Sequence, residues 1–247
     1  MSHGIEFTSE LSVKLMQQVG NDAGVVAAAR VSTIGPDAFT DVDENAGLID
    51  FLLRRRHGSA FEHNLFTFAI EAPIFVSREH VRHRVGWSMN EMSGRYTKLR
   101  PKFFVPPRGR AMRRVEGTKV GDYDYEPDEW LWHRSEGAMW RTCTSAWAEY
   151  EELLEKGVVP EVARSVLPVN VYSAWYATCN ARSLMHYLGL WTERPAEDEA
   201  PEGEEWARDP SKPMWEIEQI ADQMEAAFAE VMPLTHASFV RHGRVAP

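Results

Sequence analysis

Hydrophobic and polar residues alternate along several short stretches of the chain, which is the pattern of a half-buried β-strand. The alternation is clearest in residues 64–73, where Phe66, Phe68 and Ile70 are separated by smaller or polar residues. Stretches with a similar extended character occupy residues 5–10, 99–106 and 169–178. We therefore expect a strand in each of these four places.

Longer segments space their hydrophobic residues as a helix does. In residues 43–58, acidic residues come first, Leu48, Phe51 and Leu52 share one face, and Gly58 follows a basic end. The other predicted helices cover residues 11–32, 74–84, 128–157, 160–168, 180–191, 213–233 and 234–243, and Asn180 is expected to act as an N-cap.

Helices and strands are mixed along the chain without a regular βαβ alternation, which favours an α+β fold. We expect mixed helices around a mainly antiparallel sheet, in a single domain over residues 1–247. Residues 106–128 are rich in Arg, Gly, Pro, Asp and Tyr, and predict an excursion from this domain. Residues 193–212 hold eight acidic residues and few apolar ones, so they predict an exposed acidic loop.

Composition narrows the class of protein further. The 247 residues are 44% hydrophobic and 26% charged, which suits a globular core. A formal net charge of -10 argues against general binding to nucleic acid. Two cysteines without a CxxC motif suit a reducing compartment. The sequence has no signal-peptide pattern and no apolar run near the ~20 residues of a membrane span, so we expect a cytoplasmic protein without a membrane partner.

One stretch opposes the overall negative charge. Residues 78–100 contain five arginines, two histidines and one lysine against two carboxylates. On a helix, Arg78 and Arg82 would share a face and form an anion clamp. Ser93, Gly94 and Arg95 offer a hydroxyl, an open backbone and another guanidinium, which suit a phosphate. The stretch therefore indicates a nucleotide site, and the alternative is a solvated basic face.

Other kinds of site lack their sequence signals. The chain has no GxGxxG, no GxxxxGK[ST] and no GxSxG motif. His80 and His83 are three residues apart, but no HExxH pattern surrounds them, so we expect no metal site. Cys143 and Cys179 lie in apolar segments, which predicts buried structural thiols.

The RHR triplet at 82–84, followed by NE-x-S-x-RY, resembles the signature of the flavin-dependent thymidylate synthases, also called the thymidylate synthase-complementing family. Further blocks are similar to the family in family order, and the last of them is similar to actinobacterial members. These blocks are AARVS (28–32), HGSAFEH (57–63), PEVARSVLP (160–168), NARSLM (180–185), WEIEQIA (215–221) and MPLTHASFVRHGRVAP (232–247).

This resemblance implies a homotetramer of α+β subunits with active sites built from several subunits. It implies an enzyme that converts dUMP to dTMP with FAD as cofactor, methylenetetrahydrofolate as carbon donor and NADPH as reductant. The family uses no cysteine nucleophile on the uracil ring, and it holds FAD on arginine and histidine side chains instead of a Rossmann motif.

The resemblance also assigns residues position by position. The positions that match flavin contacts are Ser59, Glu62, Arg82, His83, Arg84, Glu91, Asn180, Ala181, Arg182 and His186. The positions that match dUMP contacts are Glu79, Arg82, Glu91, Met92, Ser93, Gly94, Arg95 and Arg164, and Ser93 and Arg95 are expected to hold the phosphate. His57 matches an active-site histidine near the substrates.

Three features depart from the family pattern. Eight residues separate the RHR triplet from Ser93, where seven are usual. Glu79 replaces a common glutamine beside the dUMP loop. Trp191 stands where the family usually has an arginine that polarises the uracil ring. Because Arg194 lies one helical turn beyond Trp191, we expect Arg194 to take that catalytic role.

Two alternatives remain beside dTMP synthesis. The departures leave room for the same fold and ligands with a different one-carbon product, such as 5-hydroxymethyl-dUMP. A non-enzymatic, arginine-rich nucleotide or RNA binder would instead be colourless and would bind RNA with a strong dependence on salt.

Overall fold

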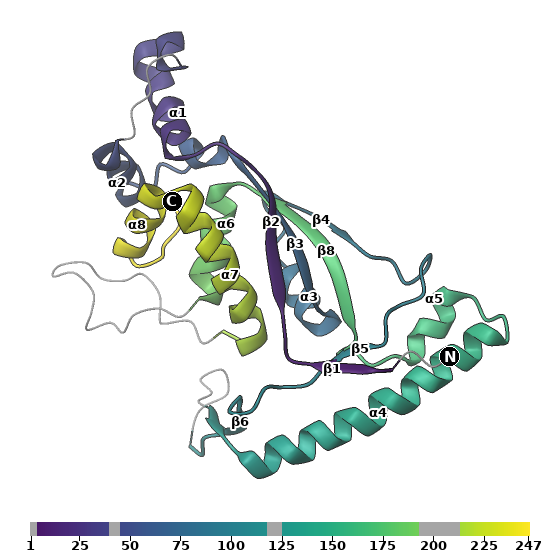
Figure 1. Cartoon of the computed structure of the whole chain (residues 1–247). Helices are drawn as coiled ribbons and strands as arrows, with labels where there is room; N and C mark the ends of the chain where they lie inside the picture. The colour runs from purple at the N-terminus through teal and green to yellow at the C-terminus, as the bar shows by residue number, and fades with distance from the viewer. Residues whose placement is uncertain (1–3, 40–44, 118–124, 193–212) are drawn as a thin grey trace. The chain divides into compact units, whose positions relative to one another are not determined.

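The computed structural model describes residues 4–39, 45–117, 125–192 and 213–247. Along the chain (Figure 1) the elements are β1 (Glu6–Thr8), β2 (Ser12–Val19), α1 (Asp22–Ile34), η1 (Gly35–Phe39), α2 (Ala46–Arg54), η2 (Ser59–Glu62), β3 (Leu65–Pro73), α3 (Ile74–His80), β4 (Trp87–Glu91), β5 (Lys102–Phe104), β6 (Ala111–Arg114), β7 (Tyr125–Pro127), α4 (Glu129–Glu155), α5 (Pro160–Ala163), η3 (Arg164–Val166), β8 (Tyr172–Cys179), α6 (Ala181–Trp191), α7 (Trp215–Val231) and α8 (Pro233–Arg241).

Residue contacts divide the chain into two compact units. The first unit comprises residues 1–11, 71–80 and 91–175. The second unit comprises residues 12–70, 81–90 and 176–247. Each unit is assembled from segments that are distant in sequence, so neither is a contiguous domain. The single domain over residues 1–247 stays a prediction.

The main sheet has four strands in the order β2-β3-β8-β4. β3 and β8 run antiparallel, because the Thr67 and Thr178 hydroxyls are 3.0 Å apart near one end of the pair. Beyond the other end of β3, the Ile74 N–H donates to the Val171 carbonyl, also at 3.0 Å. Two smaller sheets pair β1 with β5 in parallel and β6 with β7 antiparallel. The predicted α+β class, with mixed helices and an antiparallel sheet, is confirmed.

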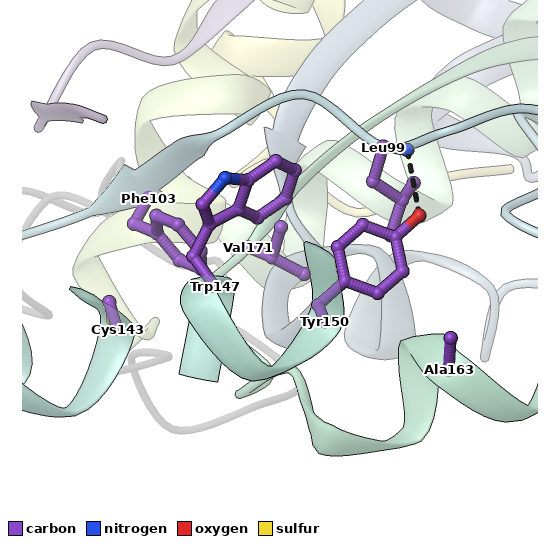
Figure 2. Close-up of a cluster of buried hydrophobic side chains, with 7 residues drawn as sticks. All are labelled: Leu99, Phe103, Cys143, Trp147, Tyr150, Ala163 and Val171. Atoms are coloured by element: carbon purple, nitrogen blue, oxygen red, sulfur yellow. Dashed lines mark hydrogen bonds between the residues drawn. The ribbon is translucent and has the colours of Figure 1, made fainter. Parts of the chain in front are cut away.

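The core of the first unit ties the β5 region to α4 and α5. Its buried residues (Figure 2) are Leu99, Phe103, Cys143, Trp147, Tyr150, Ala163 and Val171. The Leu99 N–H donates to the Tyr150 hydroxyl oxygen at 3.2 Å, which satisfies both polar groups inside the cluster. Full burial of a large apolar side chain stabilises a fold by about 1.5–3 kcal/mol. This cluster therefore holds the chain firmly just after Ser93, Gly94 and Arg95.

Helix α7 in the second unit is held by both apolar and ionic contacts. Phe66 of β3 meets Phe228 of α7 edge to face, with ring centroids 5.9 Å apart. Near the end of the chain, Arg244 donates to both carboxylate oxygens of Glu225, at 2.7 and 2.6 Å. Arg244 also donates to the Thr192 hydroxyl at 2.9 Å. The segment after α8 is therefore anchored to α7 and to the end of α6.

Most of the predicted helices and strands are confirmed, but residues 11–32 are only half helical. Residues 12–19 form β2, and α1 begins at Asp22 after Asn21, whose side chain accepts from the Gly24 N–H. In β2, Val13 and Leu15 are half-buried while their neighbours Ser12, Lys14 and Met16 are exposed. Pairing with β3 outweighs the local helical preference here.

Helix α3 in the basic stretch is shorter than predicted, and this removes the expected anion clamp. Helix α3 ends at His80, so Arg82 is not on it. The expectation that Arg78 and Arg82 share a helix face is therefore wrong. The Ile74 and Phe75 N–H groups donate to carbonyls of residues 171 and 169, so the helix start is set by a distant segment.

Two smaller predictions also need correction. In α2 the buried residues are Ile49, Leu52 and Leu53, whereas Phe51 is exposed, so the buried face is rotated from the predicted one. The excursion at 106–128 contains the β6–β7 hairpin, which composition alone does not indicate.

Among the helices in the described ranges, none combines the length and hydrophobicity that a membrane span requires.

Candidate active site

A pocket of about 610 Å³ opens in the second unit. This volume lies within the range of small-molecule sites. Three segments line it: the end of η2, the chain from the RHR triplet into β4, and the first two turns of α6. The lining residues are Glu62, Arg82, His83, Arg84, Val85, Gly86, Trp87, Asn180, Arg182, Ser183 and His186.

The start of α6 is fixed by two asparagine side chains. Asn180 caps the helix as predicted, and its Oδ1 accepts from the Ser183 N–H at 2.8 Å. Asn64 Oδ1 accepts from the Ala181 N–H at 2.6 Å. These bonds satisfy two helix N–H groups that otherwise lack partners. Ala181 is buried and is not among the residues that line the pocket, and its contact with flavin stays a prediction.

The chain between the RHR triplet and β4 turns tightly at Gly86. Its φ is +71°, and a Cβ atom there would lie 2.1 Å from Ser183 Oγ. The Trp87 N–H closes the turn on the Arg84 carbonyl at 3.4 Å. Glycine suits this position because it adopts a positive φ readily and has no Cβ atom to clash with Ser183.

Arg182 is held in place from two sides. Its Nε donates to the Pro247 main-chain oxygen at 2.8 Å, and its Nη1 donates to Glu62 Oε1 at 2.5 Å. Its guanidinium also lies against Gly58, where a Cβ atom would come within 2.5 Å of Nε. The guanidinium is therefore oriented before any ligand arrives.

His83 is hydrogen-bonded to a residue far along the chain. Trp191 Nε1 donates to His83 Nε2 at 2.6 Å, although 108 residues separate them. The Tyr187 ring lies edge-on to the imidazole, with centroids 4.9 Å apart. Burial, and then the charge of His186, lower the pKa of His83. His83 is thus held in its neutral form near neutral pH.

The charges around this pocket favour an anionic ligand. Among the described residues that line it, the arginines Arg82, Arg84 and Arg182 outnumber the carboxylates, of which there is one, Glu62. Guanidinium groups bind phosphate oxygens through paired N–H donors. The sequence did not single out Val85, Gly86, Trp87 or Ser183 as site residues. Three of them follow the RHR triplet directly and Ser183 lies within the NARSLM block, which is the sequence signal that could have done so.

A second group of predicted residues lies together in the first unit. Ser93 begins a turn in which its Oγ accepts from the Arg95 N–H at 3.3 Å. The backbone of Gly94 is packed against Arg164, whose Cδ would be 3.2 Å from a Cβ atom at Gly94. Arg95 Nε pairs with Glu161 Oε2 at 2.8 Å, and both side chains are about half exposed. A hydroxyl and two guanidinium-bearing side chains therefore gather at one turn, as a phosphate site requires.

Comparison with known proteins identifies the family. A family model described as "Thymidylate synthase complementing protein" matches residues 14–234. The chain belongs to this family. The flavin-dependent thymidylate synthase of Streptomyces coelicolor is 47% identical over 98% of this chain and 96% of its own length. That of Tropheryma whipplei strain TW08/27 is 42% identical over 98% and 97%.

A solved structure supports the same fold. The UMP/dUMP methylase PolB from Streptomyces cacaoi, bound with 5-Br dUMP, superposes with a TM-score of 0.87 at 42% sequence identity. The alignment covers 98% of this chain and all of that chain. The resemblance of the sequence to the thymidylate synthase-complementing family is therefore confirmed.

Several other described positions that match the family's site are not among the residues that line the pocket. His57 is exposed and meets Phe51 edge-on, with centroids 5.9 Å apart, and it does not line the pocket. Ser59 is exposed at the start of η2, and Glu79 is exposed on α3. Glu91 ends β4, and the Met92 N–H donates to the Ala174 carbonyl at 2.8 Å. Arg194 lies outside the described residues, so its catalytic role stays a prediction.

Both cysteines lack the surroundings of a nucleophile. Cys143 and Cys179 are buried, and burial raises the pKa of each thiol. The Cys143 sulfur lies 3.4 Å from Asn170 Oδ1. A raised pKa disfavours the reactive thiolate. Within the described residues, no group of three or more His, Cys, Asp or Glu side chains could hold a metal ion.

Proposed function

We propose that this chain is a flavin-dependent thymidylate synthase with FAD as its cofactor. The enzyme takes the methylene group of methylenetetrahydrofolate, a hydride (two electrons and one proton) from NADPH, and one proton from solvent. It thereby converts dUMP to dTMP and leaves tetrahydrofolate and NADP⁺. The main support for this proposal is the arginine-lined pocket at the RHR triplet, in a chain of the thymidylate synthase-complementing family.

The pocket in the second unit suits the flavin. Arg82, Arg84 and Arg182 supply donors for its two phosphates, and Arg182 is already oriented by Glu62 and Pro247. His83 and His186 add imidazole groups to the lining of this pocket. The bound flavin supplies two-electron chemistry that no side chain of this chain offers. The arginines here bind and orient the cofactor.

The turn at Ser93 suits the phosphate of dUMP. The Ser93 hydroxyl and the Arg95 and Arg164 guanidinium groups are donors, and Arg164 packs closely against the buried Gly94. Glu91 and Glu79 carry acceptors for donors on a base or sugar. Glu161 now pairs with Arg95 and would compete with a phosphate for that guanidinium.

We also propose a homotetramer in which each active site draws residues from several subunits. The family membership of the chain supports this assembly. The expected outcome is a mass of about four chains in light scattering after size-exclusion chromatography.

The function is tested first by colour and then by product. We expect the purified protein to show the absorption spectrum of an oxidised flavin. With dUMP, methylenetetrahydrofolate and NADPH it should form dTMP, identified by mass spectrometry, and omission of any one reactant should abolish the product. A colourless protein with salt-dependent RNA affinity would contradict the proposal. A product heavier than dTMP by one oxygen atom would indicate 5-hydroxymethyl-dUMP.

A second candidate substrate is UMP. A structure described as a UMP/dUMP methylase bound with 5-Br UMP is 43% identical to this chain, with a TM-score of 0.85. Turnover of dUMP and UMP should therefore be compared under the same conditions. Formation of 5-methyl-UMP at a comparable kcat/KM would extend the proposed function to both nucleotides.

We expect the double variant Cys143→Ser, Cys179→Ser to retain dTMP synthesis, with some loss of stability. Both thiols are buried with a raised pKa, so neither is prepared to attack a substrate. A buried hydroxyl without a good partner costs about 1–3 kcal/mol, which the thermal midpoint would reveal. A folded, flavin-bound double variant without turnover would point to thiol catalysis instead.

A further inference from the structure

The hydrogen bond between Trp191 and His83 determines where the imidazole carries its proton. The indole N–H can only donate, and it points at His83 Nε2 from 2.6 Å. Nε2 must therefore be the unprotonated acceptor. A neutral imidazole with a bare Nε2 carries its hydrogen on Nδ1. The geometry thus selects one tautomer without reference to any ligand.

The surroundings give a reason for keeping this ring neutral. The titratable and charged groups that share its pocket or pack against it are Glu62, Arg82, Arg84, Arg182, His186 and Tyr187. Three of these are permanent cations and one is a carboxylate, which already pairs with Arg182. A further positive charge on a half-buried imidazole would be repelled by its neighbours. A neutral N–H donor avoids that repulsion.

We propose that Trp191 is a positioning residue that holds His83 as the neutral Nδ1–H tautomer, so that His83 offers Nδ1–H as a donor to an oxygen or nitrogen of the bound flavin. The tautomer itself follows from contacts within the second unit. The donor role rests on the proposed flavin site. Trp191 acts on the cofactor only through His83, and it terminates α6, whose first turns line the same pocket.

The bond also explains what the tryptophan does at a position where the family usually has an arginine. An indole cannot carry a charge, so Trp191 cannot supply a cation to a substrate. Its N–H already donates to His83, and its ring lies edge-on to the imidazole, with centroids 6.1 Å apart. Trp191 therefore acts on the cofactor side of the site, through a neighbour.

The test is the variant Trp191→Phe, which keeps an aromatic ring but deletes the N–H. Histidine-labelled protein, free of flavin, is titrated by long-range ¹H–¹⁵N NMR, and the His83 signal is assigned by its absence from His83→Gln. Loss of the acceptor bond should raise the His83 pKa by about half to one unit, because a hydrogen bond of ordinary strength no longer favours the neutral form. The preference for Nδ1–H should fall at the same time. The control Trp130→Phe deletes an exposed indole N–H on α4 and should change neither.

The donor role is measured separately, as the flavin dissociation constant at pH 7.5. Trp191→Phe should weaken flavin binding by about two- to tenfold, the effect of one ordinary hydrogen bond. Unchanged titration and tautomer of His83 would overturn the proposal, even in a yellow and active enzyme. A changed tautomer with unchanged flavin affinity would overturn the donor role. The flavin-binding function itself fails only if the wild-type protein binds no flavin. If Trp191→Phe does not fold, Trp191→Tyr provides a second aromatic variant without an indole N–H.

Discussion

Replacing Arg182 with alanine is expected to weaken flavin binding by between about tenfold and a hundredfold. A charge-assisted hydrogen bond contributes about 1.5–3 kcal/mol, and each 1.4 kcal/mol is a factor of ten in affinity. The loss should lie toward the upper end of that range. Without Arg182, the Glu62 carboxylate loses its ion-pair partner in a pocket proposed to hold phosphates. Fluorescence titration of FAD into the flavin-free protein measures the effect.

The variants around Arg182 separate its charge from its geometry. Arg182→Lys keeps the charge but loses the Nε donor that bonds Pro247, so we expect an intermediate loss. Arg241→Ala removes another half-exposed arginine ion pair of the same unit, with Asp50, and serves as the matched control. Flavin binding that is equally weak in Arg182→Ala and Arg241→Ala would show that only general stability had changed. Wild-type affinity in Arg182→Ala would remove Arg182 from the site.

Arg95→Ala is expected to weaken dUMP binding by about tenfold or more while leaving flavin affinity almost unchanged. Arg95 lies at the Ser93 turn in the first unit, beside the backbone packed against Arg164. The deleted group is a charged donor to a phosphate, which accounts for the expected size. Calorimetric titration of dUMP into the flavin-bound enzyme gives one affinity, and FAD titration gives the other.

Glu161→Gln is the matched control for this second prediction. It removes the ion pair with Arg95 but leaves the guanidinium in place. Because that pair is half exposed, its loss should cost little stability. We expect dUMP to bind Glu161→Gln at least as tightly as the wild type, since a competing carboxylate is gone. Equal losses of dUMP and flavin affinity in Arg95→Ala would show that the assignment of Arg95 to the dUMP phosphate is wrong.

Several local features could be predicted from short stretches of sequence because their causes are local. The alternation of Phe66, Phe68 and Ile70 predicts β3, and all three side chains are buried. Asn180 caps α6 with a bond that spans three residues. The motif blocks assign the chain to its family, and several of the matched positions prove to line one pocket. The strand and the helix cap depend on neighbours within a few residues, which a reader of the sequence can see.

Other features depend on partners that no local pattern reveals. β2 is a strand because it pairs with β3, and α3 begins where carbonyls of residues 169 and 171 accept its N–H groups. Arg182 takes its orientation from Pro247, and His83 takes its tautomer from Trp191. The sequence by itself determined the family, most of the element types and the kinds of side chain at the site. The tertiary structure decided which of those side chains are paired, oriented or held neutral, because these properties arise from hydrogen bonds between residues that only folding brings within 3 Å.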